Sequence, residues 1–350
     1  MLKKENFTLD HIQEIKENRK IDPFLLERTV YALGLLESLV RVDMPFVFKG
    51  GTSLMLLLEK PGRLSTDIDI IVKPGTDVRH FIHEASKIFP FKKSQEQIRK
   101  GKNNIVKQHF MFWYDSPVSG NPFYILLDIL FEANHYSAFT RKKIKNDLIL
   151  TEAPYLEVQM PSVDCILGDK LTAFAPHTTG IPFGVNKELE IIKQLFDVAN
   201  LTEVCSIFSD IYDSYMATAK SEIGYRGINI QAEDALMDSI EAAACIASRG
   251  AIHPEEYLLY LGGIRSVMNH IYSERFSGER AASISCKVMY IAACVLKNHE
   301  FQRIIDATAY ARVNISDSRF KKLAPLRKLD LEAYAYTIET VRLLDESAEK

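Results

Sequence analysis

The chain has 350 residues, 47% hydrophobic and 25% charged, which predicts a folded protein of about two domains. This composition excludes a disordered chain, a collagen-like fibre and a coiled-coil rod. The 43 basic and 46 acidic residues give a net charge of −3, which excludes binding to nucleic acid by bulk charge alone and leaves a local basic patch open.

The start of the chain and the cysteines bear on the cellular compartment. Residues 1–6 are polar and lack the apolar stretch of a signal peptide, and no window approaches the roughly 20 apolar residues of a membrane-spanning helix. The five cysteines are scattered and form no CxxC pair, so we expect buried free thiols and no zinc ribbon. These features predict a cytoplasmic protein with no membrane partner.

Three regions follow one another along the chain. Residues 1–45 are predicted to be helical, with Pro23 at the start of an apolar stripe. Residues 46–160 form an α/β segment with strand patterns at 46–48, 67–72, 106–114 and 123–131 and a helix over 77–89. Helical patterns then cover 163–174, 187–201, 232–247, 255–272 and 281–296. We therefore predict an α+β fold, with a mixed β-sheet and flanking helices in residues 1–160 and a helical bundle in residues 161–350.

A glycine pair follows the first predicted strand. Gly50 and Gly51 lack Cβ atoms, so the backbone there can adopt a positive φ and approach a bulky anion closely. The N–H groups of the helix that begins at this turn, with the hydroxyls of Thr52 and Ser53, favour a phosphate. Lys49, at the strand end, is either a further phosphate contact or a solvated side chain. A glycine pair alone is more often a simple turn.

Three acidic residues point to a metal site. Asp67 and Asp69 lie two residues apart on a predicted strand, so both side chains project from one face, about 6–7 Å apart. Two carboxylates held in this way suit one or two Mg²⁺ ions, or Mn²⁺ in their place. Asp128 lies within an apolar run, where an unpaired acid is costly, and is the candidate third ligand.

Together these motifs resemble the nucleotidyltransferase superfamily, whose members carry a glycine turn, an acid–apolar–acid strand and a third acid on a later strand. More narrowly, residues 48–54 (FKGGTSL) and 63–69 (RLSTDID) resemble the AbiEii/AbiGii toxin family, which includes the MenT toxins. Asp67 follows Thr52 by fifteen residues, as in the family pattern. The resemblance covers about residues 24–201 and implies a nucleotidyltransferase-type fold.

The resemblance also implies further site residues. Arg63 and Ser65 would position the nucleotide, although both could instead cap the strand entry. Lys170 matches the family's lysine helix and would face the triphosphate; its alternative is a side chain that reaches the surface. Lys193 and Asp197 match a later segment in which Gln194 replaces a frequent acid. Residues 161–201 would thus contribute to the active site.

Positive charge is concentrated between residues 92 and 150. Ten basic residues stand there against five acidic ones, which gives +5 in a chain of −3. Such a segment is either solvated or in contact with phosphates. The ten are Lys92, Lys93, Arg99, Lys100, Lys102, Lys107, Arg141, Lys142, Lys143 and Lys145.

These observations predict a Mg²⁺-dependent nucleotidyltransferase that transfers NMP from an NTP to an acceptor hydroxyl. Asp67, Asp69 and Asp128 would hold the metal, and Asp128 would activate the hydroxyl. By resemblance, the acceptor is RNA, at a tRNA 3′ end, and the protein is the toxin of a type IV toxin–antitoxin or phage-defence system with a cognate antitoxin. The alternatives are transfer to a protein or a small molecule, and a nucleotide-binding module without catalysis.

Overall fold

The computed structural model describes residues 1–19, 21–98 and 106–345. The chain divides into two compact units. The first comprises Met1–Ser162 with Asn269–Arg275, and the second comprises Val163–Met268 with Phe276–Lys350. The short segment from Asn269 therefore belongs with the N-terminal part of the chain although it lies far along the sequence.

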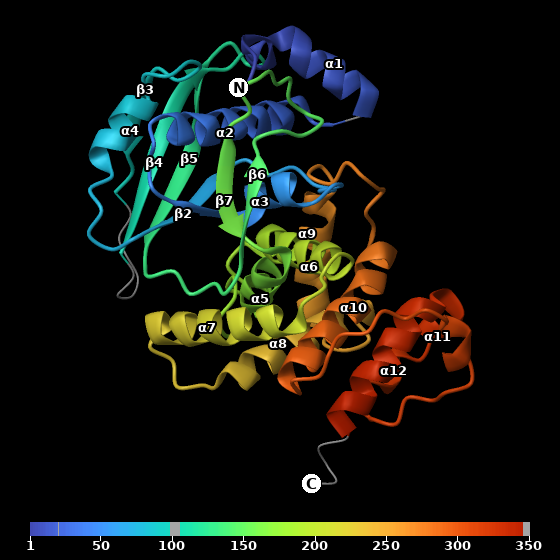
Figure 1. Ribbon diagram of the computed structural model, residues 1–350. Coiled ribbons are helices and arrows are strands. Elements are labelled where there is room, and N and C mark those ends of the chain that lie inside the picture. The colour runs from blue at the N-terminus through green and yellow to red at the C-terminus, as the bar shows by residue number, and fades with distance from the viewer. Residues whose placement is uncertain (20, 99–105, 346–350) are drawn as a thin grey trace. The chain divides into compact units, whose positions relative to one another are not determined.

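A five-stranded mixed sheet forms the centre of the first unit (Figure 1). Its strands lie in the order β1 (Val47–Lys49), β2 (Ile68–Val72), β5 (Pro122–Phe131), β4 (Lys107–Asp115) and β3 (Lys93–Glu96). Strands β2 and β5 are parallel, and the other three pairs are antiparallel. The expected mixed sheet with flanking helices is confirmed. The sequence did not predict β3, because its polar residues lack the apolar alternation of a half-buried strand.

Helix α2 (Pro23–Arg41) covers one face of this sheet (Figure 1). It begins where predicted, because Pro23 occupies its first turn and the Asp22 side chain accepts a hydrogen bond from the Leu25 N–H at 2.9 Å. The ring of Tyr31 stacks on that of Tyr114 at 3.8 Å. The buried Glu27 carboxylate accepts a hydrogen bond from the Tyr114 hydroxyl at 2.8 Å. These contacts fix which sheet face is the core and leave the opposite face to the acidic residues.

The remaining elements of the first unit are short. They are the 3₁₀ helix Lys4–Phe7, α1 (Leu9–Arg19), α3 (Gly50–Leu57), α4 (Arg79–Ala85) and the antiparallel hairpin of β6 (Phe139–Lys143) and β7 (Glu157–Pro161). The hairpin was not predicted as a pair of strands. Helix α4 is shorter than the predicted helix over 77–89, because Pro90 follows closely.

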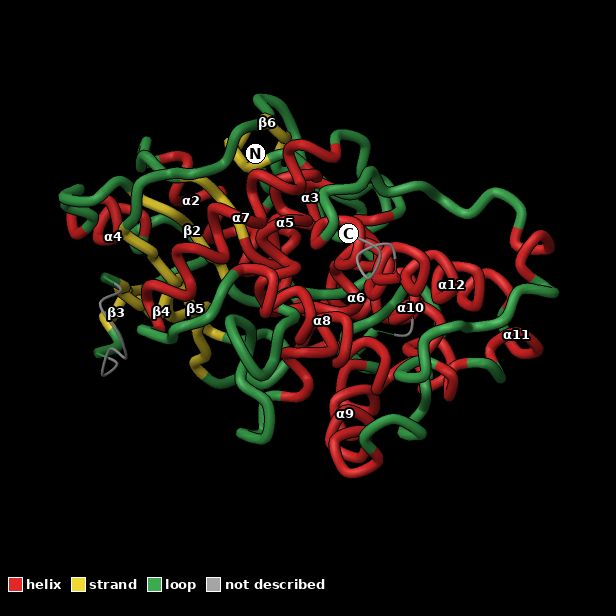
Figure 2. The backbone as a smooth tube through the Cα atoms, turned by 90° about the horizontal axis from the view of Figure 1, so that it is seen from below, coloured by secondary structure: helices red, strands yellow, loops and turns green. Residues whose placement is uncertain are grey.

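The described residues of the second unit form helices joined by loops and contain no β-strand. Its α-helices are α5 (Val163–Ala173), α6 (Glu188–Thr202), α7 (Phe208–Arg226), α8 (Ala232–Ala247), α9 (Pro254–Val267), α10 (Gly278–Leu296), α11 (Leu326–Leu329) and α12 (Leu331–Asp345). Two short 3₁₀ helices, Ala307–Tyr310 and Lys321–Leu323, lie between α10 and α11. Helices α10 and α12 lie side by side (Figure 2). The expected helical region after the sheet is confirmed.

A glycine lets two helices of this unit pack closely, and the cysteines of the unit are buried. A Cβ on Gly168 of α5 would stand 2.4 Å from the Ile211 carbonyl oxygen of α7, so glycine permits this close approach. All five cysteines are free and buried, which confirms that expectation. Within the described residues, no helix combines the length and the apolar character that crossing a membrane requires.

Helix α9 ends at Val267, five residues before the predicted end at Tyr272. Residues 268–270 form a turn, and Ile271 then forms an isolated antiparallel bridge with Arg63 of the same unit as Asn269–Arg275. The Leu64 N–H donates to the His270 carbonyl at 2.8 Å, and the Tyr272 N–H donates to the Gly62 carbonyl at 3.0 Å. Apolar periodicity continues through this stretch, but the backbone leaves the helix and pairs with the segment Gly62–Leu64.

Candidate active site

The glycine turn places Gly50 directly against an acidic residue. Gly50 has a φ of +78°, and a Cβ built there would stand 2.0 Å from Oδ2 of Asp69. Glycine is therefore required at this position for two reasons, the left-handed backbone and the carboxylate that packs on its α-carbon. The turn and the acid strand form one structural element.

Four of the strands contribute one polar residue each to a single row across the sheet. Asp69 is the register partner of Lys49 on β1 and of Asp128 on β5, and Asp128 is the partner of His109 on β4. Residues directly opposite one another point to the same face. The row Lys49–Asp69–Asp128–His109 therefore lies on the face that α2 does not cover. Three of these residues, Lys49, Asp69 and Asp128, were predicted from the sequence to belong to one site.

His109 is the residue of this row that sequence reasoning missed. Its Nδ1 lies 2.6 Å from Oδ1 of Asp128, and the two side chains are 14% and 31% exposed. His109 alternates with the buried Phe110 and Phe112 along β4, so its place on the opposite face was readable from the sequence. Its pairing with Asp128 was not, because that depends on strand register.

Asp67 lies immediately before β2, and its side chain is 48% exposed. An Nη2 atom of Arg28, on α2, is 3.5 Å from its Oδ1. Arg28 Nε is buried and has no hydrogen-bond partner among the described residues. The guanidinium offsets some of the negative charge of the acid pair. Arg28 was also missed, because its sequence position in a helix gives no sign of this contact.

The three carboxylates suit a hard divalent cation in donor chemistry and in position on adjacent strands. In the present side-chain positions, however, no three acidic, histidine or cysteine side chains of the described residues converge on one point. Asp128 is engaged by His109, and Asp67 by Arg28. A cation would therefore have to draw Asp67 and Asp128 toward Asp69, and Asp128 can offer its Oδ2 while Oδ1 keeps its bond to His109.

Arg63 and Ser65 pack on the second glycine of the turn. A Cβ on Gly51 would stand 2.7 Å from Arg63 Nη2 and 2.8 Å from Ser65 Oγ. Arg63 is buried, and its Nη1 donates to the Leu64 carbonyl at 3.0 Å. The bridge to Ile271 holds this arginine's backbone in place. The structure thus brings both residues to the glycine turn, as the motif spacing suggested.

Thr52 and Ser53 are buried in α3, where their hydroxyl groups stabilise the turn. Thr52 Oγ1 donates to the Asp67 carbonyl at 2.5 Å, and Ser53 Oγ donates to the Gly50 carbonyl at 2.8 Å. The first bond ties the helix start to the acid strand. Contact of either hydroxyl with a phosphate stays a prediction.

The site residues predicted beyond residue 160 form a separate cluster in the second unit. Lys170 Nζ lies 2.9 Å from Asp197 Oδ2 and donates to Gln194 Oε1 at 2.9 Å. The Lys170 and Asp197 side chains are only 9% and 2% exposed, so the predicted alternative of a surface lysine does not apply. Lys193 Nζ lies 3.3 Å from Glu190. The catalytic roles of Lys170 and Asp197 and the nucleotide-binding role of Lys193 stay predictions that rest on the resemblance.

The described residues of the basic segment lie in three places in the first unit, one of them Lys107 at the start of β4. Lys92 pairs with Asp115, and Lys93 lies 5.4 Å from the ring centroid of Trp113, both at the β3–β4 edge. Four basic residues lie on or next to β6 of the hairpin, namely Arg141, Lys142, Lys143 and Lys145. Three of the ten basic residues, Arg99, Lys100 and Lys102, lie outside the described residues.

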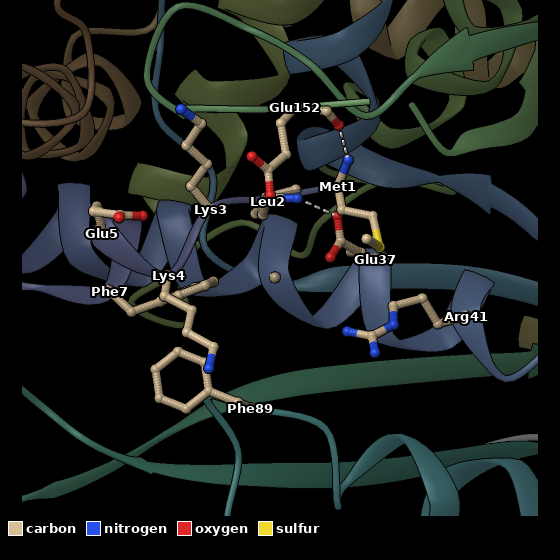
Figure 3. A pocket seen from close by; sticks show the side chains of 11 residues that line it. Met1, Leu2, Lys3, Lys4, Glu5, Phe7, Glu37, Arg41, Phe89 and Glu152 are labelled. Atoms are coloured by element: carbon tan, nitrogen blue, oxygen red, sulfur yellow. Dashed lines mark hydrogen bonds between the residues drawn. The ribbon is translucent and has the colours of Figure 1, made fainter. Parts of the chain in front are cut away.

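A cavity of about 440 Å³ near the N-terminus is lined by none of these site residues (Figure 3). The Met1 ammonium donates to the Pro154 carbonyl at 2.7 Å, and the Leu2 N–H donates to Glu37 Oε2 at 2.6 Å. Burial raises the pKa of Glu37, and the bond from Leu2 partly opposes that rise. These contacts anchor the first residues against α2 and are distinct from the acid row.

Comparisons with known proteins identify the family to which the chain belongs. A family model described as the nucleotidyl transferase AbiEii toxin of type IV toxin–antitoxin systems matches residues 34–243. Among solved structures, the chain is similar to JHP933 from Helicobacter pylori, with 14% sequence identity, a TM-score of 0.44, and coverage of 78% of this chain and 93% of that one. No curated protein matches the chain.

Proposed function

Because the chain belongs to the AbiEii family of nucleotidyl transferase toxins of type IV toxin–antitoxin systems, we propose that it transfers NMP from an NTP to a hydroxyl of an RNA acceptor, at a tRNA 3′ end. The reaction would occur in the cytoplasm, where a cognate antitoxin would counteract it. The family model covers residues 34–243, which contain the glycine turn and all three acids of the proposed site.

One observation carries the proposal: Asp69 is in register with Asp128 on the adjacent parallel strand and packs on Gly50 of the turn. Carboxylates and phosphate-binding backbone N–H groups are thereby held next to each other by rigid strands. This is the combination that transfer of a nucleotidyl group requires, because negative charge on the phosphates must be neutralised and held in place.

Asp67, Asp69 and Asp128 would hold Mg²⁺, or Mn²⁺. A bound divalent cation would neutralise charge on the triphosphate and on the leaving group. The backbone N–H groups of the Gly50–Gly51 turn would hold the phosphates, and Lys49, next to the turn, would add a positive charge. Arg63 and Ser65, packed on Gly51, would keep the turn in its bound shape.

The acceptor hydroxyl oxygen would attack the α-phosphorus, forming a new P–O ester bond. The bond from the α-phosphorus to the oxygen that bridges it to the β-phosphorus would break, and pyrophosphate would leave. Asp128 would accept the hydroxyl proton. Its contact with His109 keeps the carboxylate oriented toward the row of polar residues.

The test is incubation with each labelled NTP, Mg²⁺ and total cellular RNA. Wild-type protein should label tRNA with one NTP or a subset of NTPs, and Asp67→Ala should not. Asp10→Ala is the matched control, because Asp10 is an exposed acid on α1, outside the site. Equal labelling by wild type and Asp67→Ala would overturn the assignment of Asp67.

The same reaction mixture also tests the alternative acceptors. Label in protein or in a small molecule, with none in RNA, would contradict the RNA acceptor. Nucleotide binding without any covalent transfer would contradict catalysis. Growth arrest on expression of the wild type, relieved by Asp69→Ala, is the expected result for a toxin that acts through this site.

A further inference from the structure

The β6–β7 hairpin carries four basic side chains within five residues, from Arg141 to Lys145. In the described part of the chain, none of the four forms an ion pair. Glu157 stands opposite Lys143 in register, yet the two do not pair within 4.0 Å. Other cationic side chains of the same unit do form ion pairs. The Nη1 atom of Arg19, for example, lies 2.7 Å from Oδ2 of Asp147. Within the described residues, these four cations are therefore not held in ion pairs.

Two of these cations share one aromatic ring. The Nζ atoms of Lys143 and Lys145 each lie 5.5 Å from the ring centroid of Tyr155, whose side chain is 42% exposed. Arg141 and Lys143 are two residues apart on β6 and project from the same exposed face. Like charges placed together repel, and an anionic polymer bound across them would relieve that repulsion.

The hairpin starts next to the glycine turn of the proposed active site. Lys49 Nζ lies 5.8 Å from the ring centroid of Tyr136, and this ring is 6.4 Å from that of Phe139, the first residue of β6. Strand β7 contacts β1, and β6 contacts α3. From Phe139 to Lys143 the strand rises about 13 Å at about 3.3 Å per residue. The cations thus lie beside the glycine turn, displaced along β6 from the position at which the turn would hold the reacting phosphates.

We propose that the hairpin face of Arg141, Lys143, Lys145 and Tyr155 binds the sugar–phosphate backbone of the RNA acceptor and stacks one of its bases. This inference rests on the RNA acceptor of the proposed function. Cations repeated along an extended strand match a polymer with one charge per unit, and an exposed aromatic ring among them is typical of surfaces that bind single-stranded nucleic acid.

The experiment measures binding of a labelled single-stranded oligoribonucleotide and of total tRNA by the full chain, without NTP, at about 50 to 200 mM salt. The variant is Arg141→Gln/Lys143→Gln/Lys145→Gln. The matched control is Arg312→Gln/Lys321→Gln/Lys328→Gln, which removes one Arg and two Lys charges from exposed positions of the second unit. Thermal unfolding and NTP binding establish that each variant is folded.

We expect the hairpin variant to bind RNA with a salt slope smaller by about 2, since each contact to a single-stranded phosphate contributes roughly 0.7. Over that fourfold range of salt, the affinity of the wild type should fall about 20-fold further than that of the variant. Tyr155→Leu should weaken binding without changing the salt slope, because it removes stacking and no charge. The control should bind as the wild type does.

RNA affinity and salt slope equal to those of the control would overturn the inference. So would unchanged RNA binding combined with loss of binding to an acidic partner protein, which would assign the hairpin to that partner. The proposed function is tested separately. Hairpin-dependent RNA binding without nucleotidyl transfer would contradict the reaction and support the hairpin. Transfer to RNA at unchanged kcat/KM by the hairpin variant would support the reaction and contradict the hairpin.

Discussion

Asp69 and Gly50 are in direct contact, so that no other residue fits at position 50 without displacing the carboxylate. The contact joins the glycine turn to the acid strand across the antiparallel β1–β2 pair. Two motifs separated by more than a dozen residues in the sequence are thereby a single structural element in space.

Gly50→Ala should therefore abolish nucleotidyl transfer and destabilise the fold. The matched control is Gly75→Ala, because Gly75 has a φ of +84° and nothing within 4 Å of its Cβ position. The control should lose only the roughly 1–2 kcal/mol of left-handed backbone strain and keep its activity. Chemical denaturation and transfer assays measure both. Equal effects of the two substitutions would show that the contact with Asp69 is unimportant.

His109 should act on the reaction through Asp128. His109→Leu removes the partner at 2.6 Å, and loss of such a supporting hydrogen bond costs about 10- to 100-fold in metal affinity. The Mg²⁺ concentration for half-maximal transfer should rise accordingly. His109→Asn, which keeps an N–H group near the position of Nδ1, should recover part of the loss. A Mg²⁺ titration that is the same for all three proteins would exclude this role.

Lys170 and Asp197 should behave as a buried pair in measurements of stability. Lys170→Met removes the ammonium that lies 2.9 Å from the buried Asp197 carboxylate and should cost up to about 3–5 kcal/mol of unfolding free energy. The double variant Lys170→Met/Asp197→Leu should recover much of that loss. If the double variant is stable and still transfers nucleotide at the wild-type rate, the pair is purely structural. Loss of transfer in a stable double variant is the outcome that the family resemblance predicts.

His177, in the loop after α5, should make stability depend on pH. Its hydrogen bond to Asp238 at 2.8 Å raises the pKa of His177 above 6.5, and the charges of Asp238 and Glu256 add to this rise against burial. A raised pKa stabilises the folded state fully below about pH 6.5, and this contribution is lost as the pH rises through the folded-state pKa. The unfolding temperature of wild type should exceed that of His177→Gln most at pH 6, and less at pH 8. A difference that does not change with pH would contradict this.

Local sequence patterns predicted the parts of the site whose geometry is set within one strand or turn. Asp67 and Asp69 needed only the alternation of a strand, and Gly50 only the permissive backbone of glycine. His109 and Arg28 depend on strand register and on the packing of α2, which local patterns do not contain. The bridge from Ile271 to Arg63 joins residues more than two hundred positions apart, so the amphipathic pattern over 255–272 predicted a helix at its end where the chain pairs with a distant segment.

The central claim is that this site adds a nucleotide to RNA by means of its three aspartates. The most direct measurement is the intact mass of tRNA after incubation with NTP, Mg²⁺ and either wild type or Asp128→Asn. Wild type should increase the tRNA mass by one or more whole nucleotide residues, and Asp128→Asn should leave it unchanged. Unmodified tRNA after incubation with folded wild type that binds NTP would contradict this claim. The same mass increase with Asp128→Asn as with wild type would also contradict it.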